Sequence, residues 1–238
     1  GSPQIATGYG SAGAGGGCGG VSGGMWRTVD GGASWTKTTK PEQFHSVTTL
    51  AQDTRTGHTS TWYYGTGELS GNSAGDRSGS AFYRGDGIYK STDGGNSWSV
   101  LSSTSSNKPQ SFNSNFNYVW TVQVVPANGY VIAATYNGIK RSIDGGDTWT
   151  DILKPSTGSS SYSDVIINGS AIYATLSYGS DKAGIWRSGD YGDTWTNITP
   201  SNFPSSYSRM VVGGAPSNDN IVYLIGDLGS GHTLWKYT

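Results

Sequence analysis

Two carboxylates outside any repeat, Asp53 and Glu68, are the residues whose positions best suit acid–base chemistry. Cleaving a glycosidic bond requires two carboxyl groups facing one cleft, one to protonate the leaving oxygen and one to activate water or attack the sugar. Asp53 ends one expected strand, Val47–Asp53, and Glu68 ends the next, Thr61–Glu68. These two residues are therefore the first candidates for catalysis, although both side chains also suit the capping of turns.

Four other aspartates each belong to a short pattern that recurs along the chain as VDGGASWT, TDGGNSWS, IDGGDTWT and GDYGDTWT. Asp-Gly and Gly-Gly between two strands predict a tight hairpin turn, in which the Asp accepts hydrogen bonds from its own turn. We therefore expect these aspartates to be structural and the tryptophans to pack between neighbouring sheets. The residues concerned are Asp30 and Trp35, Asp93 and Trp98, Asp144 and Trp149, and Asp190 and Trp195.

The histidines and the single cysteine give no sign of a metal site or a disulfide. His45, His58 and His232 are far apart in the sequence and show none of the spacings typical of metal ligands. Cys18 has no second cysteine with which to pair. We therefore expect neither a metal nor a cofactor.

The recurring pattern lies within a larger repeat. Its aspartates stand at positions 30, 93, 144 and 190, so successive copies are 63, 51 and 46 residues apart. Each unit reads as strand, strand, strand, Asp-Gly turn, strand, and the first spacing is longer because of a polar insertion at Leu69–Phe82. A period of about 45–50 residues with four short strands predicts a β-propeller in which each unit is one blade.

We therefore predict an all-β chain that forms part of a β-propeller of four-stranded antiparallel blades. The chain is expected to contain about four to five of these blades. The expected blade units of this single domain are residues 1–40, 41–104, 105–155, 156–200 and 201–238. Leu234–Thr238 aligns with Ile88–Thr92, which precedes an Asp pattern. From this alignment we expect a partial propeller that belongs to a longer polypeptide.

The composition agrees with a protein of sheets and turns. Its 238 residues include 38 Gly, 15 Tyr and 9 Trp, so large aromatic side chains can supply much of the core. A formal net charge of −1 gives no basic footprint for nucleic acid, and no run of about 20 apolar residues forms a transmembrane segment. Abundant Ser, Thr, Asn and Gly with few Lys and Glu favour an extracellular location.

The four patterns resemble the Asp-box, also called the bacterial neuraminidase repeat. The stretches GTGELSGNSAG and FYRGDGIYKSTDGGNSW are similar to the sortilin-type and xyloglucanase-type propellers of large secreted proteins of Bacteroidota. The resemblance covers nearly the whole chain and implies blades of a secreted, outer-membrane-associated surface protein, exported by type IX secretion through a C-terminal sorting domain. It implies no activity, because the Asp-box is scaffold in all these families.

The resemblance also includes sialidases, which hold the substrate carboxylate with three arginines, one of them in an Arg-Ile-Pro motif. This sequence has no Arg-Ile-Pro. Arg27, Arg141 and Arg187 belong to the repeat, where Lys90 and Lys236 occupy the same position, so we expect them on the solvent side of their strands. These residues argue against a sialidase.

Aromatic residues outside the pattern are the candidates for ligand contact. Side chains alternate between the two faces of a strand, and outward-facing rings stack on sugars or pack against protein partners. The residues selected on this basis are Trp62, Tyr64, Tyr83 and Tyr136.

Our leading hypothesis is a secreted or cell-surface binding module without catalysis, directed at a glycan or a surface protein. A component of a larger surface assembly is a further hypothesis. The alternative is a glycoside hydrolase of the xyloglucanase type that uses Asp53 and Glu68.

Overall fold

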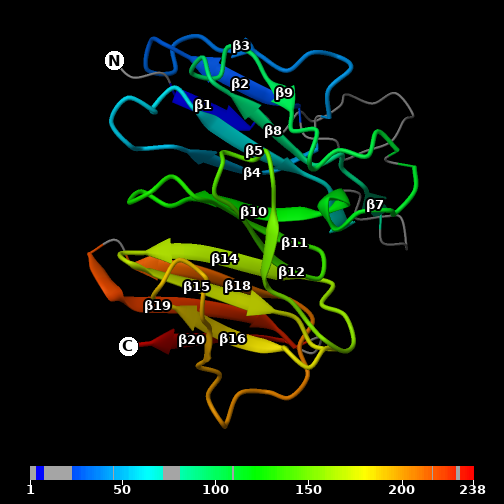
Figure 1. The fold of residues 1–238 in the computed structure, drawn as a ribbon, viewed down its shortest axis with the longest axis vertical. Helices are drawn as coiled ribbons and strands as arrows, with labels where there is room; N and C mark the ends of the chain where they lie inside the picture. The colour runs from blue at the N-terminus through cyan, green and yellow to red at the C-terminus, as the bar shows by residue number, and fades with distance from the viewer. Residues whose placement is uncertain are drawn as a thin grey trace. The chain divides into compact units, whose positions relative to one another are not determined.

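The computed structural model describes residues 4–7, 23–44, 46–71, 81–108, 110–215, 217–228 and 231–238. Within these residues the regular elements are β-strands, apart from one short 3₁₀ helix, η1 (Asn115–Asn117) (Figure 1). The strands form antiparallel sheets, so the all-β class predicted from the sequence is confirmed. No helix in the described part of the chain is long and apolar enough to cross a membrane.

The chain divides into two compact units, residues 1–119 and residues 120–238. The first unit holds a three-stranded sheet of β1 (Gln4–Thr7), β2 (Met25–Thr28) and β3 (Thr36–Lys37). It also holds a four-stranded sheet of β4 (Val47–Gln52), β5 (Trp62–Thr66), β8 (Ile88–Ser91) and β9 (Ser99–Val100). A separate ribbon pairs β6 (Glu68–Gly71) with β7 (Ala81–Tyr83), so both ends of the predicted polar insertion are strands.

The core of the first unit is aromatic, as the composition predicts. The rings of Tyr64 and Tyr89 stack with centroids 4.7 Å apart, and Trp98 meets Tyr64 edge-on at 4.9 Å. Met25 from the three-stranded sheet joins this cluster. Stacked and edge-to-face pairs of this kind stabilise a core beyond the burial of their area, by about 0.5–1.5 kcal/mol each.

The second unit holds three sheets. The first contains β10 (Val119–Val124), β11 (Val131–Thr135), β12 (Gly138–Ser142) and β13 (Thr150–Leu153). The second contains β14 (Ser163–Asn168), β15 (Ala171–Leu176), β16 (Gly184–Ser188) and β17 (Thr196–Asn197). The third contains β18 (Met210–Ala215), β19 (Asn218–Asp227) and β20 (His232–Tyr237).

The sheet β14–β17 packs face to face on the sheet β18–β20. Tyr173 and Ile185 of the former share a buried cluster with Met210, Val212 and Leu224 of the latter. Every residue of β15 is buried, whereas β20 alternates between exposed and half-buried positions. Strands covered on both faces are buried throughout, and a strand covered on one face alternates.

Along the chain the sheets follow one another in the order β1–β3, β4-β5-β8-β9 with its inserted ribbon β6–β7, β10–β13, β14–β17 and β18–β20. Repeated small antiparallel sheets are the organisation of propeller blades, and here each is built from consecutive strands except β4-β5-β8-β9, which the ribbon β6–β7 interrupts.

Candidate functional site

Each Asp turn closes through one recurring set of hydrogen bonds. In the first turn the Thr28 hydroxyl donates to Asp30 Oδ1 (2.6 Å), which also accepts from the Ser34 amide (2.9 Å). Asp30 Oδ2 accepts from the Ser34 hydroxyl (2.6 Å), and the Gly32 amide donates to the Thr28 hydroxyl oxygen (3.0 Å). The same four contacts recur around Asp93, Asp144 and Asp190. Both oxygens of each carboxylate are therefore engaged inside the turn.

These hydrogen bonds hold the carboxyl pKa well below its usual range. The hydroxyl and amide of Thr194 and the hydroxyl of Ser188 lower the pKa of Asp190 to about 2. Donation by Ser34 and by Thr148 lowers the pKa of Asp30 and of Asp144 further still. A general acid or base works best with a pKa near the operating pH, so these carboxylates suit the support of a turn and not proton transfer.

Two of the repeat arginines connect neighbouring sheets, which corrects the expectation that they face solvent. In the first unit Arg27 Nε donates to the Gly94 carbonyl (2.9 Å) in the Asp turn of the next sheet. In the second unit Arg141 Nη1 donates to the Tyr191 carbonyl (2.9 Å) and pairs with Asp193 (2.8 Å). The acceptors lie 67 and 50 residues further along the chain, so no local pattern reveals them.

The two catalytic candidates lie at opposite ends of the β4–β5 pair. The strands are antiparallel, with Gln52 opposite Trp62 and Val47 opposite Thr66. Asp53 follows the first of these pairs and Glu68 follows the second, so roughly 16 Å of sheet separates them at about 3.3 Å per residue. Glycosidase carboxyls work about 5–9.5 Å apart. The expectation of a shared cleft is therefore wrong, because consecutive antiparallel strands end at opposite edges.

Asp53 is buried and paired within its own turn. Arg55 Nη2 lies 2.7 Å from Asp53 Oδ2, and Arg55 Nε donates to Oδ1 (3.0 Å). This hydrogen-bonded ion pair lowers the pKa of Asp53 despite its burial. Glu68, half-buried, opens β6 opposite Tyr83 of β7.

The aromatic residues selected from the sequence differ in their surroundings. Tyr64 is 0% exposed, and burial raises its pKa, so it belongs to the core and cannot contact a ligand. Trp62 packs against the same core cluster while remaining half-buried. Tyr136 is half-buried in the turn after β11. The Tyr83 side chain lies outside the described residues.

A cavity of about 350 Å³ opens in the second unit, where β14 and β18 begin and β15 and β19 end. Three tyrosines and four serines, but no charged side chain, line it. We call it the Tyr–Ser pocket. Its residues are Ser161, Tyr162, Ser177, Tyr178, Ser206, Tyr207, Ser208 and Leu228.

The wall of the Tyr–Ser pocket is fixed by hydrogen bonds and its rim is open. The buried Tyr207 hydroxyl donates to the Leu176 carbonyl (3.1 Å), and the Tyr162 amide donates to Ser177 Oγ (3.1 Å). Tyr178 is 60% exposed at the rim. Because most of these side chains are already ordered, a ligand can bind with little loss of side-chain conformational entropy.

A cation contacts Tyr162, one of the lining residues of the pocket. The Arg209 guanidinium is 5.4 Å from the Trp120 ring centroid and 5.5 Å from that of Tyr162. The two rings are themselves 5.2 Å apart. Contact with two aromatic faces fixes the guanidinium and stiffens the Tyr162 side of the pocket.

Two further polar clusters lie near the pocket, and neither is arranged for catalysis. Burial raises the pKa of Asp164, whose carboxylate accepts from the Thr121 hydroxyl and from the amides of Val165 and Val212. Ser208 Oγ donates to Asp227 Oδ2 (2.5 Å), and His232 Nδ1 lies 3.8 Å from Asp227 Oδ1. A nucleophilic triad needs the His between Ser and Asp, and here the Asp stands between the other two.

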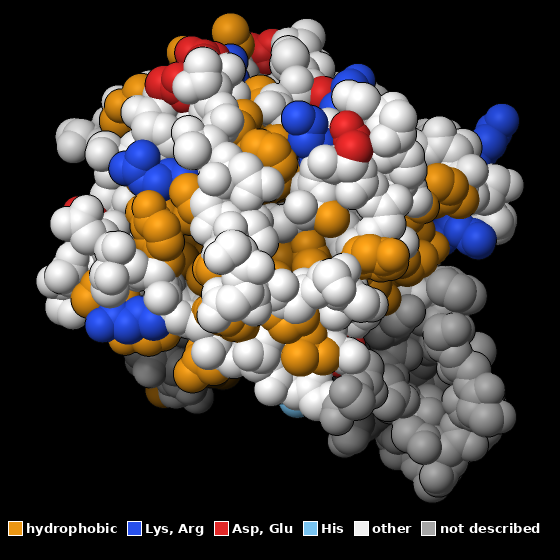
Figure 2. All heavy atoms as spheres, turned by 90° about the horizontal axis from the view of Figure 1, so that it is seen from below, with side chains coloured by type: hydrophobic (Ala, Val, Ile, Leu, Met, Phe, Trp, Pro, Cys, Tyr) orange, Lys and Arg blue, Asp and Glu red, His pale blue; other side chains and the backbone are white. Residues whose placement is uncertain are grey.

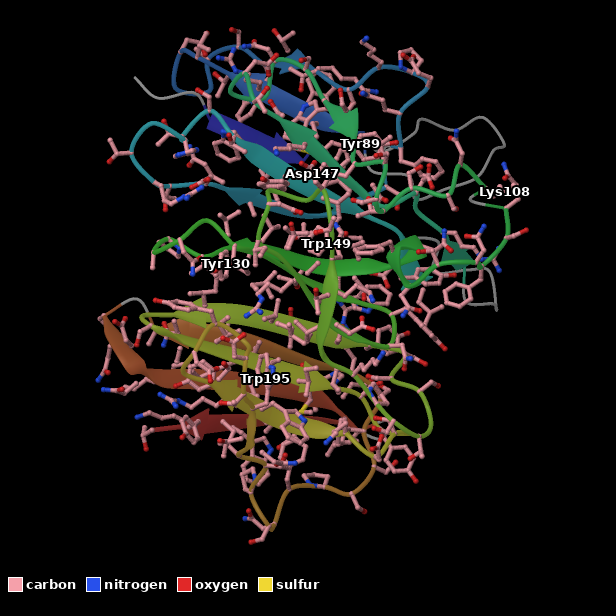
Figure 3. All side chains as sticks on the ribbon, viewed as in Figure 1. Tyr89, Lys108, Tyr130, Asp147, Trp149 and Trp195 are labelled. Carbon is pink, nitrogen blue, oxygen red and sulfur yellow. The ribbon has the colours of Figure 1, made fainter. Side chains whose placement is uncertain are left out.

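A second cavity of the second unit, about 370 Å³, lies at the edge of the Asp turns and is mostly apolar. Tyr191 lines it from the fourth turn, with Pro126, Ile167 and Ile172. Tyr191 has a φ of 60°, at the place where the first turn has Gly31 (φ 73°). Its ring meets Tyr130 edge-on at 6.3 Å. Figure 3 labels Tyr130 and the tryptophans of the third and fourth turns, Trp149 and Trp195.

A repeated dipeptide in the sequence marks the residues of the Tyr–Ser pocket, although the aromatic residues selected from the sequence include none of the pocket's tyrosines. The dipeptide Ser-Tyr occurs at Ser161-Tyr162, Ser177-Tyr178 and Ser206-Tyr207, each time where an inner strand begins or ends. The three copies meet because β14 and β18 begin, and β15 ends, beside the pocket. Among the described residues, no three His, Cys, Asp or Glu side chains gather as a metal site would require.

No protein-family model matches the chain. No curated protein is a detectable relative. Among solved structures the chain is similar to the GH74 xyloglucanase of Xanthomonas campestris, at 22% identity and a TM-score of 0.55 over 91% of this chain and 27% of that one. It is also similar to the extracellular domain of a one-component system of B. thetaiotaomicron, at 10% identity and a TM-score of 0.56 over 89% of this chain and 24% of that one.

A third similar structure is YCF48 bound to a D1 peptide, at 16% identity and a TM-score of 0.50 over 88% of this chain and 57% of that one. The chain therefore spans between about a quarter and about three fifths of the length of these three structures. Likeness at such identities concerns the fold and not the activity. The four-stranded antiparallel sheets and these similarities together show that the chain is all-β and forms part of a β-propeller.

Proposed function

We propose that this chain is a non-catalytic binding module whose Tyr–Ser pocket receives part of an uncharged glycan. The observation that carries the proposal is the lining, three tyrosines and four serines without a charged side chain. Tyrosine rings stack on the apolar faces of sugar rings, and serine hydroxyls both donate to and accept from sugar hydroxyls. A lining without an acid or a base supports binding and offers no group for proton transfer.

The position of the pocket supports the same proposal. It lies at the ends of strands, where loops of a rigid scaffold carry binding residues in many folds. Its volume of about 350 Å³ suits one or two sugar rings, with Tyr178 left exposed to stack on a further ring at the rim. The glycan is thus expected to enter from the rim and to end against Tyr207.

We also propose that the module belongs to a secreted or outer-membrane-associated surface protein, in which it forms part of a larger assembly. The Asp-box resemblance and the likeness to an extracellular domain support this location. A surface protein in place of a glycan remains a partner to test, because a similar structure, YCF48, binds a peptide.

Titration calorimetry with uncharged β-glucan and xyloglucan oligosaccharides tests the pocket. We expect Tyr178→Ala to raise the dissociation constant by about tenfold, because it removes an exposed stacking ring while leaving the core intact. Phe112→Ala, which truncates an exposed ring of the first unit, is the matched control and should change nothing. Equal affinity in the Tyr178→Ala variant, or no binding of any glycan, contradicts the proposed site.

The second candidate function is a glycoside hydrolase of the xyloglucanase type, which the likeness to a GH74 xyloglucanase favours. Hydrolysis of xyloglucan, β-glucans and sialosides should be measured for the chain and for Asp53→Asn and Glu68→Gln. Because the two carboxylates lie at opposite ends of one strand pair, we expect no hydrolysis that depends on both. Hydrolysis that either substitution abolishes would show that the chain is an enzyme and would contradict the proposal of a non-catalytic binding module.

A further inference from the structure

The hydroxyl groups that line the Tyr–Ser pocket differ in whether their proton is already used inside the protein. A serine or tyrosine hydroxyl has one proton to donate and lone pairs that accept. A hydroxyl that donates within the protein can therefore offer a ligand only its lone pairs. Three lining residues are fixed by such bonds, namely Ser177, Tyr207 and Ser208.

Tyr207 directs its proton into the protein. Its hydroxyl lies 3.1 Å from the Leu176 carbonyl oxygen, and because a carbonyl oxygen only accepts, Tyr207 must be the donor. Burial raises the pKa of Tyr207, so the phenol keeps its proton at neutral pH. The Tyr207 oxygen can therefore accept a hydrogen bond from a ligand and cannot donate one.

Ser208 is oriented by a carboxylate. Its hydroxyl donates to Asp227 Oδ2 (2.5 Å), and an ionised carboxylate only accepts. The Ser208 amide also donates to the Asp227 carbonyl (2.9 Å), so the backbone holds the same two residues together. Like Tyr207, Ser208 is left with lone pairs for a ligand.

Ser177 is fixed through a second serine. The Ser160 hydroxyl donates to the Tyr162 carbonyl (2.7 Å), because that oxygen only accepts. In the contact between the Ser160 and Ser177 hydroxyls (3.1 Å), Ser177 must then be the donor. Ser177 also accepts from the Tyr162 amide (3.1 Å) and is 2% exposed. It therefore stabilises the wall, and the fixed oxygens that a ligand meets are those of Tyr207 and Ser208.

The rim of the pocket adapts to a ligand. The hydroxyls of Tyr178 and Ser206 belong to exposed residues, and an exposed hydroxyl can turn either to donate or to accept. Such groups pair with many ligands and separate few of them. Discrimination is thus expected from the fixed oxygens.

Long-range charge does not select the ligand. The chain has 15 Lys and Arg against 16 Asp and Glu, so its net charge is close to zero. Figure 2 shows one face of the molecule, on which charged side chains of both signs are scattered among uncharged ones. Because a nearly neutral protein neither attracts nor repels anions strongly at a distance, the choice falls to hydrogen bonds inside the pocket.

We propose that the Tyr–Ser pocket selects a sugar unit by the hydroxyl protons that the sugar donates, with Tyr207 and Ser208 as the specificity-determining acceptors. This selection rests on the proposed glycan-binding function of the same pocket. A neutral sugar with free hydroxyls can pair with both oxygens. A carboxylate or a methyl ether only accepts, so it would cover these oxygens without pairing with them, which weakens binding. The ligand class is therefore neutral glycans with unsubstituted hydroxyls, and uronates are excluded.

Titration calorimetry with cellotetraose and its derivatives tests the selection. In one series a single hydroxyl of the terminal unit is replaced with fluorine, which has no proton to donate and is no larger than a hydroxyl. In a second probe the terminal unit is a glucuronic acid. We expect at least one fluoro derivative, and the uronate, to bind about tenfold more weakly than cellotetraose.

Two variants identify the acceptors. Tyr207→Phe removes the acceptor oxygen and keeps the ring, and Ser208→Ala removes the other. In at least one of them, the affinity ratio between cellotetraose and the discriminated fluoro derivative should fall to about one. Tyr64→Phe is the matched control, because it removes a buried phenol that also donates to a backbone carbonyl, that of Phe44 (3.4 Å), and it should keep the original ratio. A loss of stability alone does not change a ratio measured within one variant.

The outcomes separate this selection from glycan binding itself. Equal affinity for cellotetraose and every fluoro derivative, or a ratio that neither variant changes, would overturn the selection and leave the binding function in place. Tighter binding of the uronate would mean that the Arg209 guanidinium determines the choice, and would overturn it too. If cellotetraose fails to bind while a xyloglucan oligosaccharide binds, the selection is wrong and the function stands. If no glycan binds, both are wrong.

Discussion

At the scale of single residues, the surroundings of each carboxylate decide what it can do. The two carboxylate oxygens of Asp190 accept hydrogen bonds from the Ser188 hydroxyl and from the hydroxyl and amide of Thr194. Asp53 is paired with Arg55 through two hydrogen bonds. In both cases the donors stabilise the ionised form, so these groups contribute to folding as anions.

The Asp turns should make stability fall in acid. A carboxyl whose pKa is lower in the folded chain stabilises it above the unfolded value of about 3.9, and this stabilisation is lost as pH falls through the folded value. For Asp190 that value is about 2. We therefore expect these turns to make thermal midpoints fall as the pH decreases from about 4 to about 2.

The substitution Asp190→Asn should lower the midpoint at neutral pH and reduce its dependence on acid, because one of the depressed carboxyls is gone. Asp147→Asn, at an exposed aspartate of the third turn (Figure 3), is the control and should keep the original slope. Identical acid slopes for the original chain and Asp190→Asn would contradict the role given to the turn hydrogen bonds.

At the scale of elements, a residue of the repeat contributes according to the sheet that covers it. Trp98 is buried between two sheets of the first unit, and Trp35 is open. We expect Trp98→Ala to destabilise the first unit by about 3–5 kcal/mol, and Trp35→Ala by about 1 kcal/mol or less. Urea denaturation at low protein concentration measures the free energy of unfolding of both variants. Equal losses of this free energy would mean that burial between sheets does not determine how much each tryptophan stabilises the fold.

The direction of neighbouring strands explains why the prediction that Asp53 and Glu68 face one cleft is wrong. Asp53 and Glu68 stand at the ends of neighbouring strands, which in a parallel arrangement would place them on one edge. Their strands are antiparallel, so the first ends where the second begins. The residues that do share an edge, such as Tyr162 and Tyr178, come from the beginning of one strand and the end of the next.

At the scale of the whole molecule, two compact units predict unfolding in more than one step. Calorimetry should resolve two transitions, because separate cores need not melt together. Trp98→Ala should lower the midpoint of one transition, and Met210→Ala, in the buried cluster of the second unit, that of the other. A single transition that both substitutions shift equally would contradict independent cores.

The sequence by itself determined the features that depend on neighbouring residues. The Asp-Gly turns, the four-strand repeat and the aromatic core follow from turn chemistry, strand alternation and composition, which act over a few residues. Tertiary structure decided what depends on stacking between sheets: the burial of Tyr64, the reach of Arg27 and Arg141, and the meeting of three Ser-Tyr dipeptides around one cavity. Those contacts join residues tens of positions apart, and only strand register and sheet packing bring them together.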